Sequence, residues 1–201
     1  MNNLSIGGID LSDYEKYIQQ FLDFLESDQK IMLITGLDDD AKIRMVLNGL
    51  NKKFNSGMIR CSELGRIAMI INQAFNNSPL PQKINGQKLY PIGNMKVRFS
   101  KYIDSMVNYP IGDQLDFVIY FPIETVLMPG KEKYLEQLLN NIEHTVSTKT
   151  ILMTTNDPRK NMKVLRDMVD EHLHYDIAND NPELLETVKS NLGELEYPYF
   201  G

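Results

Sequence analysis

Hydrophobic positions along the chain follow two alternating patterns. In several stretches apolar residues recur every three or four positions, which is typical of helices that bury one face. Between them lie short runs that are apolar at nearly every position, as in strands buried on both faces of a sheet. The predicted helices cover residues 14–25, 43–54, 64–75, 134–146, 165–173 and 184–192, and the predicted strands cover 31–35, 58–61, 116–123, 150–155 and 174–177.

This strand–helix alternation predicts the fold class. About five such units favour a mainly parallel sheet of about five strands with helices on both faces, a three-layer α/β sandwich. The length of 201 residues suits one domain that spans residues 1–201.

One stretch interrupts the alternation. Asn85-Gly86 is a hairpin turn signal, and residues 95–100 alternate between apolar and polar side chains, the pattern of a half-exposed antiparallel strand. We therefore expect a β-hairpin inserted at 76–110.

Composition excludes several classes of partner. The chain carries a net charge of −6, and no run of basic residues is longer than Lys52-Lys53, so a basic patch that binds nucleic acid directly is not expected. No apolar run is long enough to cross a membrane, and no signal peptide is evident at the start of the sequence. The single cysteine, Cys61, gives no internal disulfide, so the expected location is cytoplasmic.

The loop after the first predicted strand carries the most suggestive motif. Gly36 and Lys42 have the spacing of the first glycine and the lysine in G-x-x-x-x-G-K-[ST]. The chain thereby resembles a degenerate P-loop NTPase domain of the AAA+ type. The resemblance implies Mg²⁺ with ATP as ligands, with Lys42 toward phosphate, Glu124 as the acidic residue and Asn156 as a polar sensor.

The same loop departs from the motif in ways that oppose phosphate binding. Ala41 replaces the second glycine, and Ile43 replaces the hydroxyl residue that binds Mg²⁺. Three consecutive aspartates, residues 38–40, place negative charge where phosphates would lie. We expect them to cap the next helix and to favour the positive end of its dipole, and we expect Lys42 to be solvated.

A second resemblance involves the same aspartates. The segment 38–47 is similar to the acidic pocket of response-regulator receiver domains, which implies that Asp38 and Asp39, with Asp40 beside them, hold a metal ion. Phe121 stands where the receiver's phosphorylated aspartate would be, and Asn181 stands in place of its lysine. The resemblance therefore points to a relative that is not phosphorylated.

Two histidines form another candidate site. His172 and His174 point to different sides of a helix, and only an extended segment would align them. Aligned, and with carboxylates nearby, they could bind a metal ion; otherwise they belong to a solvated helix end.

Two functional hypotheses remain. The first is a non-catalytic regulatory or scaffolding protein on a nucleotide-binding-like fold, which needs no cofactor and contacts another protein or itself. The second is a nucleotide- or metal-dependent enzyme that uses an atypical P-loop. Exposed aromatic side chains are the expected partner contacts of the first hypothesis. They are Tyr90, Tyr102 and Tyr109 in the insertion and Tyr197, Tyr199 and Phe200 in the tail.

Overall fold

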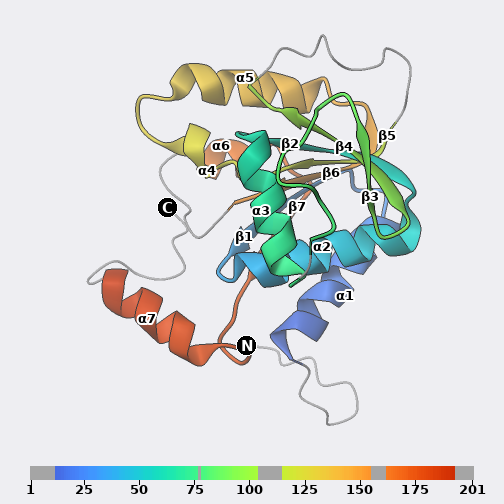
Figure 1. Ribbon diagram of the computed structural model, residues 1–201. Helices are drawn as coiled ribbons and strands as arrows, with labels where there is room; N and C mark the ends of the chain where they lie inside the picture. The colour runs from blue at the N-terminus through green and yellow to red at the C-terminus, as the bar shows by residue number, and fades with distance from the viewer. Residues whose placement is uncertain (1–11, 77, 104–114, 155–161, 193–201) are drawn as a thin grey trace.

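A computed structural model describes residues 12–76, 78–103, 115–154 and 162–192. These residues form strands and helices in alternation (Figure 1). The strands are β1 Ile31–Gly36, β2 Ser56–Cys61, β3 Leu89–Ile92, β4 Met95–Lys101, β5 Leu115–Tyr120, β6 Ser147–Met153 and β7 Glu171–Tyr175. The helices are α1 Asp13–Glu26, α2 Asp39–Lys53, α3 Leu64–Ala74, α4 Glu124–Leu127, α5 Glu132–Glu143, α6 Met162–Arg166 and α7 Pro182–Leu192.

The strands make one seven-stranded sheet in the order β3-β4-β2-β5-β6-β1-β7. Every neighbouring pair is parallel except β3 and β4, which are antiparallel. Since all the parallel strands end at the same edge, the loops that follow β1, β5, β6 and β7 meet there. That edge is where ligands bind in open α/β sheets.

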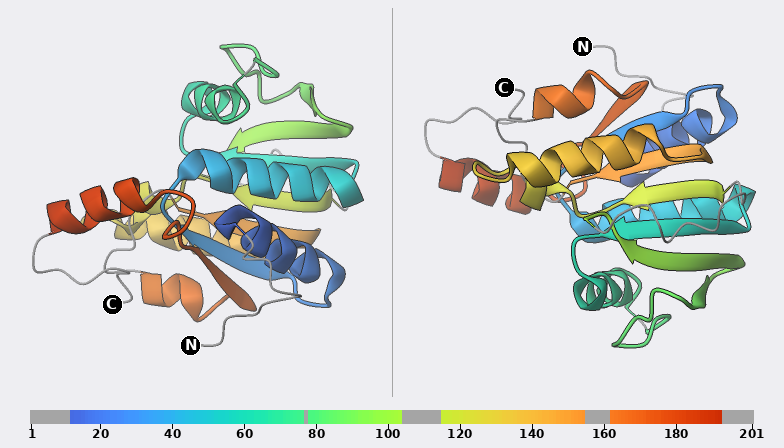
Figure 2. Two further views of the ribbon diagram at one scale, coloured as in Figure 1. Left: turned by 90° about the horizontal axis from the view of Figure 1, so that it is seen from below. Right: turned by 90° about the horizontal axis from the view of Figure 1, so that it is seen from above.

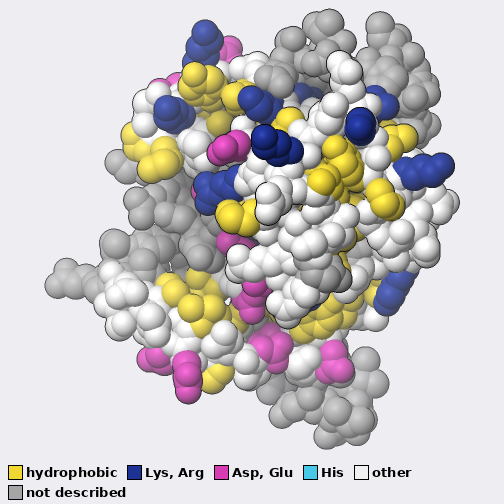
Figure 3. Space-filling model, viewed as in Figure 1, with side chains coloured by type: hydrophobic (Ala, Val, Ile, Leu, Met, Phe, Trp, Pro, Cys, Tyr) yellow, Lys and Arg dark blue, Asp and Glu magenta, His cyan; other side chains and the backbone are white. Residues whose placement is uncertain are grey.

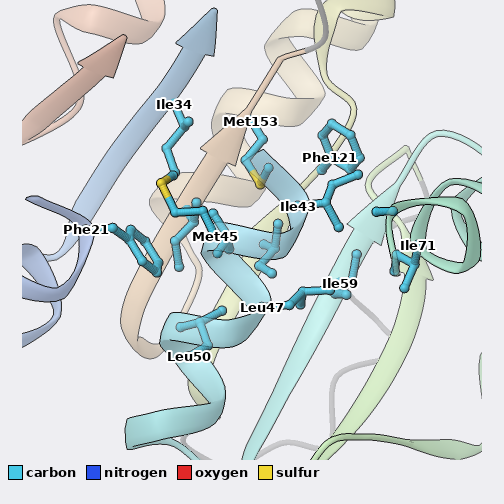
Figure 4. Close-up of a cluster of buried hydrophobic side chains, with 14 of the residues drawn as sticks. Phe21, Ile34, Ile43, Met45, Leu47, Leu50, Ile59, Ile71, Phe121 and Met153 are labelled. Carbon is cyan, nitrogen blue, oxygen red and sulfur yellow. The ribbon is translucent and has the colours of Figure 1, made fainter. Parts of the chain in front are cut away.

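Helices cover both faces of the sheet, and each face has its own hydrophobic core (Figure 2). Helices α1, α2 and α3 pack on one face, whereas α4, α5 and α6 pack on the other. Within the first core, α2 buries Ile43, Leu47 and Leu50 toward the sheet (Figure 4). The predicted α/β class, with a mostly parallel sheet and helices, is confirmed.

The hairpin differs from its prediction. The strands β3 and β4 belong to the main sheet, because β4 pairs with β2 from Lys96 to Lys101. The turn lies at Gly93-Asn94, where Gly93 has a φ of +59°, and not at Asn85-Gly86. The alternation over residues 95–99 buries Met95, Val97 and Phe99 in the first core, so the sheet has seven strands instead of about five.

The region before α7 also differs. The helix predicted to reach residue 173 ends at Arg166, and residues 171–175 form β7 beside β1. The side chain of Asp170 accepts hydrogen bonds from the backbone N–H groups of Lys30 (2.7 Å) and Ile31 (2.8 Å), which joins the starts of the two strands. Residues 172 and 174 therefore lie on a strand, where alternate side chains share a face.

Candidate functional site at the end of β1

The loop that resembles a P-loop begins at Gly36, the last residue of β1. Gly36 has a φ of +109°, and a Cβ atom there would collide with the backbone of Tyr175 on β7. A glycine is therefore required by the close approach of two neighbouring strands.

The first aspartate of the loop caps α2, as predicted. Asp38 adopts a left-handed conformation with a φ of 61°, and its Oδ1 accepts a hydrogen bond of 2.9 Å from the N–H of Ala41. Asp40, two residues further along, accepts a long hydrogen bond of 3.4 Å from the Nε2 of Gln73 on α3. Both carboxylates are thus engaged by the protein itself.

Lys42 is completely buried, which corrects the prediction that it is solvated. Its Nζ donates hydrogen bonds to the carbonyl oxygens of Gly36 (2.6 Å) and Thr154 (2.8 Å), at the ends of β1 and β6. The same atom lies 2.9 Å from the Oδ1 of Asp39. Two hydrogen bonds to carbonyl groups and one ion pair thus surround the ammonium group.

The electrostatics of this pair follow from burial. Burial lowers the pKa of Lys42, and the negative charges of Asp39, Glu124 and Asp38 oppose that change. Burial likewise raises the pKa of Asp39, against the attraction of Lys42. Glu124, half-buried at the start of α4, is close enough to affect both groups, so the structure gathers Gly36, Lys42, Asp39 and Glu124 at one edge.

Thr154 is a member of this cluster that sequence reasoning missed. It contributes through its backbone carbonyl, which any residue carries, so the sequence holds no signal for it. Asn156, the predicted sensor residue, lies outside the described residues.

Beside the loop lies a cleft of about 230 Å³. Its walls are polar on the side of α2 and apolar on the side of α7, and the lining residues are Leu37, Asp38, Asp39, Asp40, Gln73, Leu184 and Val188. The carboxylates of Asp38, Asp39 and Asp40, which line this small cleft, repel a phosphate group.

The two histidines meet at one hydroxyl group. His172 Nε2 lies 2.9 Å and His174 Nδ1 lies 3.0 Å from the Oγ1 of buried Thr35, on β1. A hydroxyl donates only one hydrogen, so at least one of these ring nitrogens donates to it. Burial, together with the positive charge of Arg166, lowers the pKa of His172 to about 4, and burial also lowers the pKa of His174.

The extended segment that would align the histidines is therefore present, although a metal-binding set is not evident. Among the residues that the structure describes, no group of three or more His, Cys, Asp or Glu side chains is placed to hold a metal ion. Sequence reasoning also missed Thr35, because its role depends on the pairing of β1 with β7.

Of the aromatic residues predicted as partner contacts, the structure describes Tyr90 and Tyr102, and neither is fully exposed. Tyr102 is fully buried and its hydroxyl donates to the carbonyl of Pro122 (3.1 Å), which corrects the prediction of exposure. Tyr90 is half-buried, with its ring 5.8 Å from that of Phe99. Three further tyrosines and a phenylalanine, namely Tyr109, Tyr197, Tyr199 and Phe200, lie outside the described residues.

Comparison with known proteins identifies no family, so the functional assignment rests on the geometry described above. No family model matches the sequence, and no curated protein is detectably similar to it. Within the described residues, no helix is both long enough and apolar enough to span a membrane.

Proposed function

We propose that the chain is a non-catalytic regulatory or scaffolding protein that retains a nucleotide-binding-like frame and acts through contacts with other proteins. The observation that carries this proposal is the position of Lys42. Its ammonium group is bound by two carbonyl groups and a carboxylate of its own chain. A P-loop lysine has to present that group to a phosphate.

The cost of releasing Lys42 supports the proposal. Separating a buried ion pair costs about 3–5 kcal/mol, because one charge is left without its partner. A nucleotide would have to offset that cost while its phosphates approached Asp38, Asp39 and Asp40. The order of the strands differs from that of receiver domains. In receiver domains the first strand lies next to the second, whereas β1 here lies between β6 and β7.

The alternative, an enzyme with an atypical P-loop, keeps one observation in its favour. Lys42, Asp39 and Glu124 do lie together at the ligand-binding edge of the sheet. An acidic group beside a lysine is compatible with phosphate chemistry assisted by Mg²⁺.

Calorimetric titration with Mg²⁺ and ATP, paired with a phosphate-release assay, separates the two proposals. We expect no heat of binding and no release of phosphate above that of buffer. A micromolar dissociation constant, together with turnover that Glu124→Gln abolishes, would establish the enzyme.

A further inference from the structure

The chain separates its charges sharply along the sequence. Its net charge is −6, yet between Glu63 and Asp104 it has no acidic residue and six basic ones, Arg66, Lys83, Lys88, Lys96, Arg98 and Lys101. In Figure 3, Lys and Arg side chains surround hydrophobic ones over β3 and β4, while most Asp and Glu side chains lie in the lower half of the view. Arg66 lies on α3, Lys83 and Lys88 lie between α3 and β3, and the other three basic residues lie on β4.

Strand pairing places four residues of the hairpin, two of them basic, on one surface. Leu89 is directly opposite Arg98, and Pro91 is directly opposite Lys96, so all four side chains share one face of the sheet. We call these four residues the hairpin face. Leu89 is 53% exposed, Pro91 and Lys96 are exposed, and Arg98 is half-buried.

No described helix covers the hairpin face. The opposite face of the hairpin packs into the first core through Met95, Val97 and Phe99. The second core, on the side of α4, α5 and α6, contains no described residue of β3 or β4. Within the described residues, the hairpin face therefore has no hydrophobic core packed against it.

The cations on this face have no anionic partner among the residues that the structure describes. Neither Lys96 nor Arg98 forms an ion pair with a carboxylate of the described residues. The Nε of Arg98 is buried, and it has no hydrogen-bond acceptor within the described part of the protein. The two terminal nitrogens of a guanidinium group can still bind a carboxylate through two parallel hydrogen bonds.

The edge of the sheet is less suited to binding than its face. β3 is a short edge strand, and Pro91 within it removes one of the backbone donors that an added strand would need. Recognition therefore has to use the side chains of the face.

The chemistry of the face favours an acidic protein segment over nucleic acid. Single-stranded nucleic acid is commonly bound by stacking on exposed aromatic rings. Here Tyr90 turns away from the hairpin face, packs against Phe99, and accepts a hydrogen bond from the N–H of Asn85 (2.7 Å). The exposed side chain between the two cations is instead an aliphatic one, Leu89.

We infer that the hairpin face binds an acidic segment of a partner protein, with carboxylates on Lys96 and Arg98 and an apolar side chain on Leu89. The inference rests on the proposed function as a binding protein, and it names the chemistry of the partner. Contacts of this kind are strengthened by opposite charges that face each other in the interface, and they are weakened by salt.

The test is fluorescence anisotropy with a labelled peptide in which Glu alternates with Leu. The double variant Lys96→Glu/Arg98→Glu is compared with Lys133→Glu/Lys163→Glu, which makes the same change of charge at exposed positions of α5 and α6. We expect the hairpin variant to bind about tenfold more weakly or worse, and the control to bind like the original protein. Lys96→Glu alone and Leu89→Ser, both at exposed sites, should each weaken binding while circular dichroism stays unchanged.

Three other probes define the results that would overturn the inference. They are the same peptide with Gln in place of Glu, a single-stranded oligothymidine, and vesicles of phosphatidylserine with phosphatidylcholine. Tighter binding of the DNA or the vesicles, equal losses in both double variants, or no binding of the acidic peptide would each contradict it. A phosphate-release assay on the same preparations tests the proposed function separately, because ATP turnover would overturn that proposal without affecting the peptide result.

Discussion

Replacement of Lys42 by methionine tests the central contact of the site. The substitution keeps a long side chain in the cavity but removes the ammonium group. Two carbonyl oxygens and the Asp39 carboxylate then lose their donor. A P-loop lysine, by comparison, serves a ligand, and its loss leaves the unliganded fold largely intact.

The expected magnitude follows from burial. Breaking a buried ion pair costs about 3–5 kcal/mol, and each buried acceptor left unsatisfied costs about 1–3 kcal/mol. The Asp39 side chain keeps 27% of its surface exposed, so water recovers part of this loss. We therefore expect Lys42→Met to lower the free energy of unfolding by about 3 kcal/mol.

Urea denaturation measures this difference, and Lys52→Met is the matched control. Lys52 lies on the same helix with its side chain exposed, so its replacement should change stability by less than about 0.5 kcal/mol. Adding Asp39→Asn to Lys42→Met should cost less than the sum of the single effects, since the carboxylate has already lost its partner. Equal stabilities for Lys42→Met and Lys52→Met would refute the buried contact.

Three further predictions concern the strand ends and the second core. Gly36→Ala should lower the free energy of unfolding in urea by about 2 kcal/mol or more, because Gly36 has a positive φ and the added Cβ would collide with the backbone of Tyr175. The control Gly65→Ala, on α3 with open space around it, should be neutral or stabilising. Acid titration of stability should show a loss as the pH falls from 6.5 toward 4, since the folded state keeps His172 neutral while the unfolded state binds a proton. Partial exposure limits that loss to about 1–2 kcal/mol, and thermal melts of His172→Gln should show a smaller pH dependence. Tyr102→Phe should lower the free energy of unfolding by about 1 kcal/mol in chemical denaturation, because the hydrogen bond to Pro122 is lost, and it should not affect peptide binding. A Tyr102→Phe variant that lost peptide binding but kept its stability would contradict the buried placement of Tyr102.

Local patterns were sufficient for most of the elements. A capping box formed by Ser12 and Glu15 begins α1. The apolar stripes that predict α1, α2 and α5 correspond to buried faces of those helices. These signals depend only on neighbouring residues, so they are visible without the fold. The buried runs that became β1, β5 and β6 are of the same kind.

The remaining features depend on contacts between distant parts of the chain. Lys42 is buried because it meets the carbonyl of Thr154, 112 positions away, and a carbonyl leaves no trace in the sequence. The histidines align because β7 pairs with β1, and Thr35 is 137 positions from His172. The hairpin joins the main sheet because β4 pairs with β2. The local alternation of apolar and polar residues does not predict which strand β4 pairs with.

The most direct test of the account is the NMR spectrum of the Lys42 side chain in protein with labelled lysines. A buried ammonium group with three acceptors should give slowly exchanging Nζ protons, and millimolar Mg²⁺ with ATP should change neither their shifts nor their exchange. Fast exchange without nucleotide, or a saturable shift of the Lys42 signal on addition of ATP, would contradict the claim that this lysine is held by its own chain.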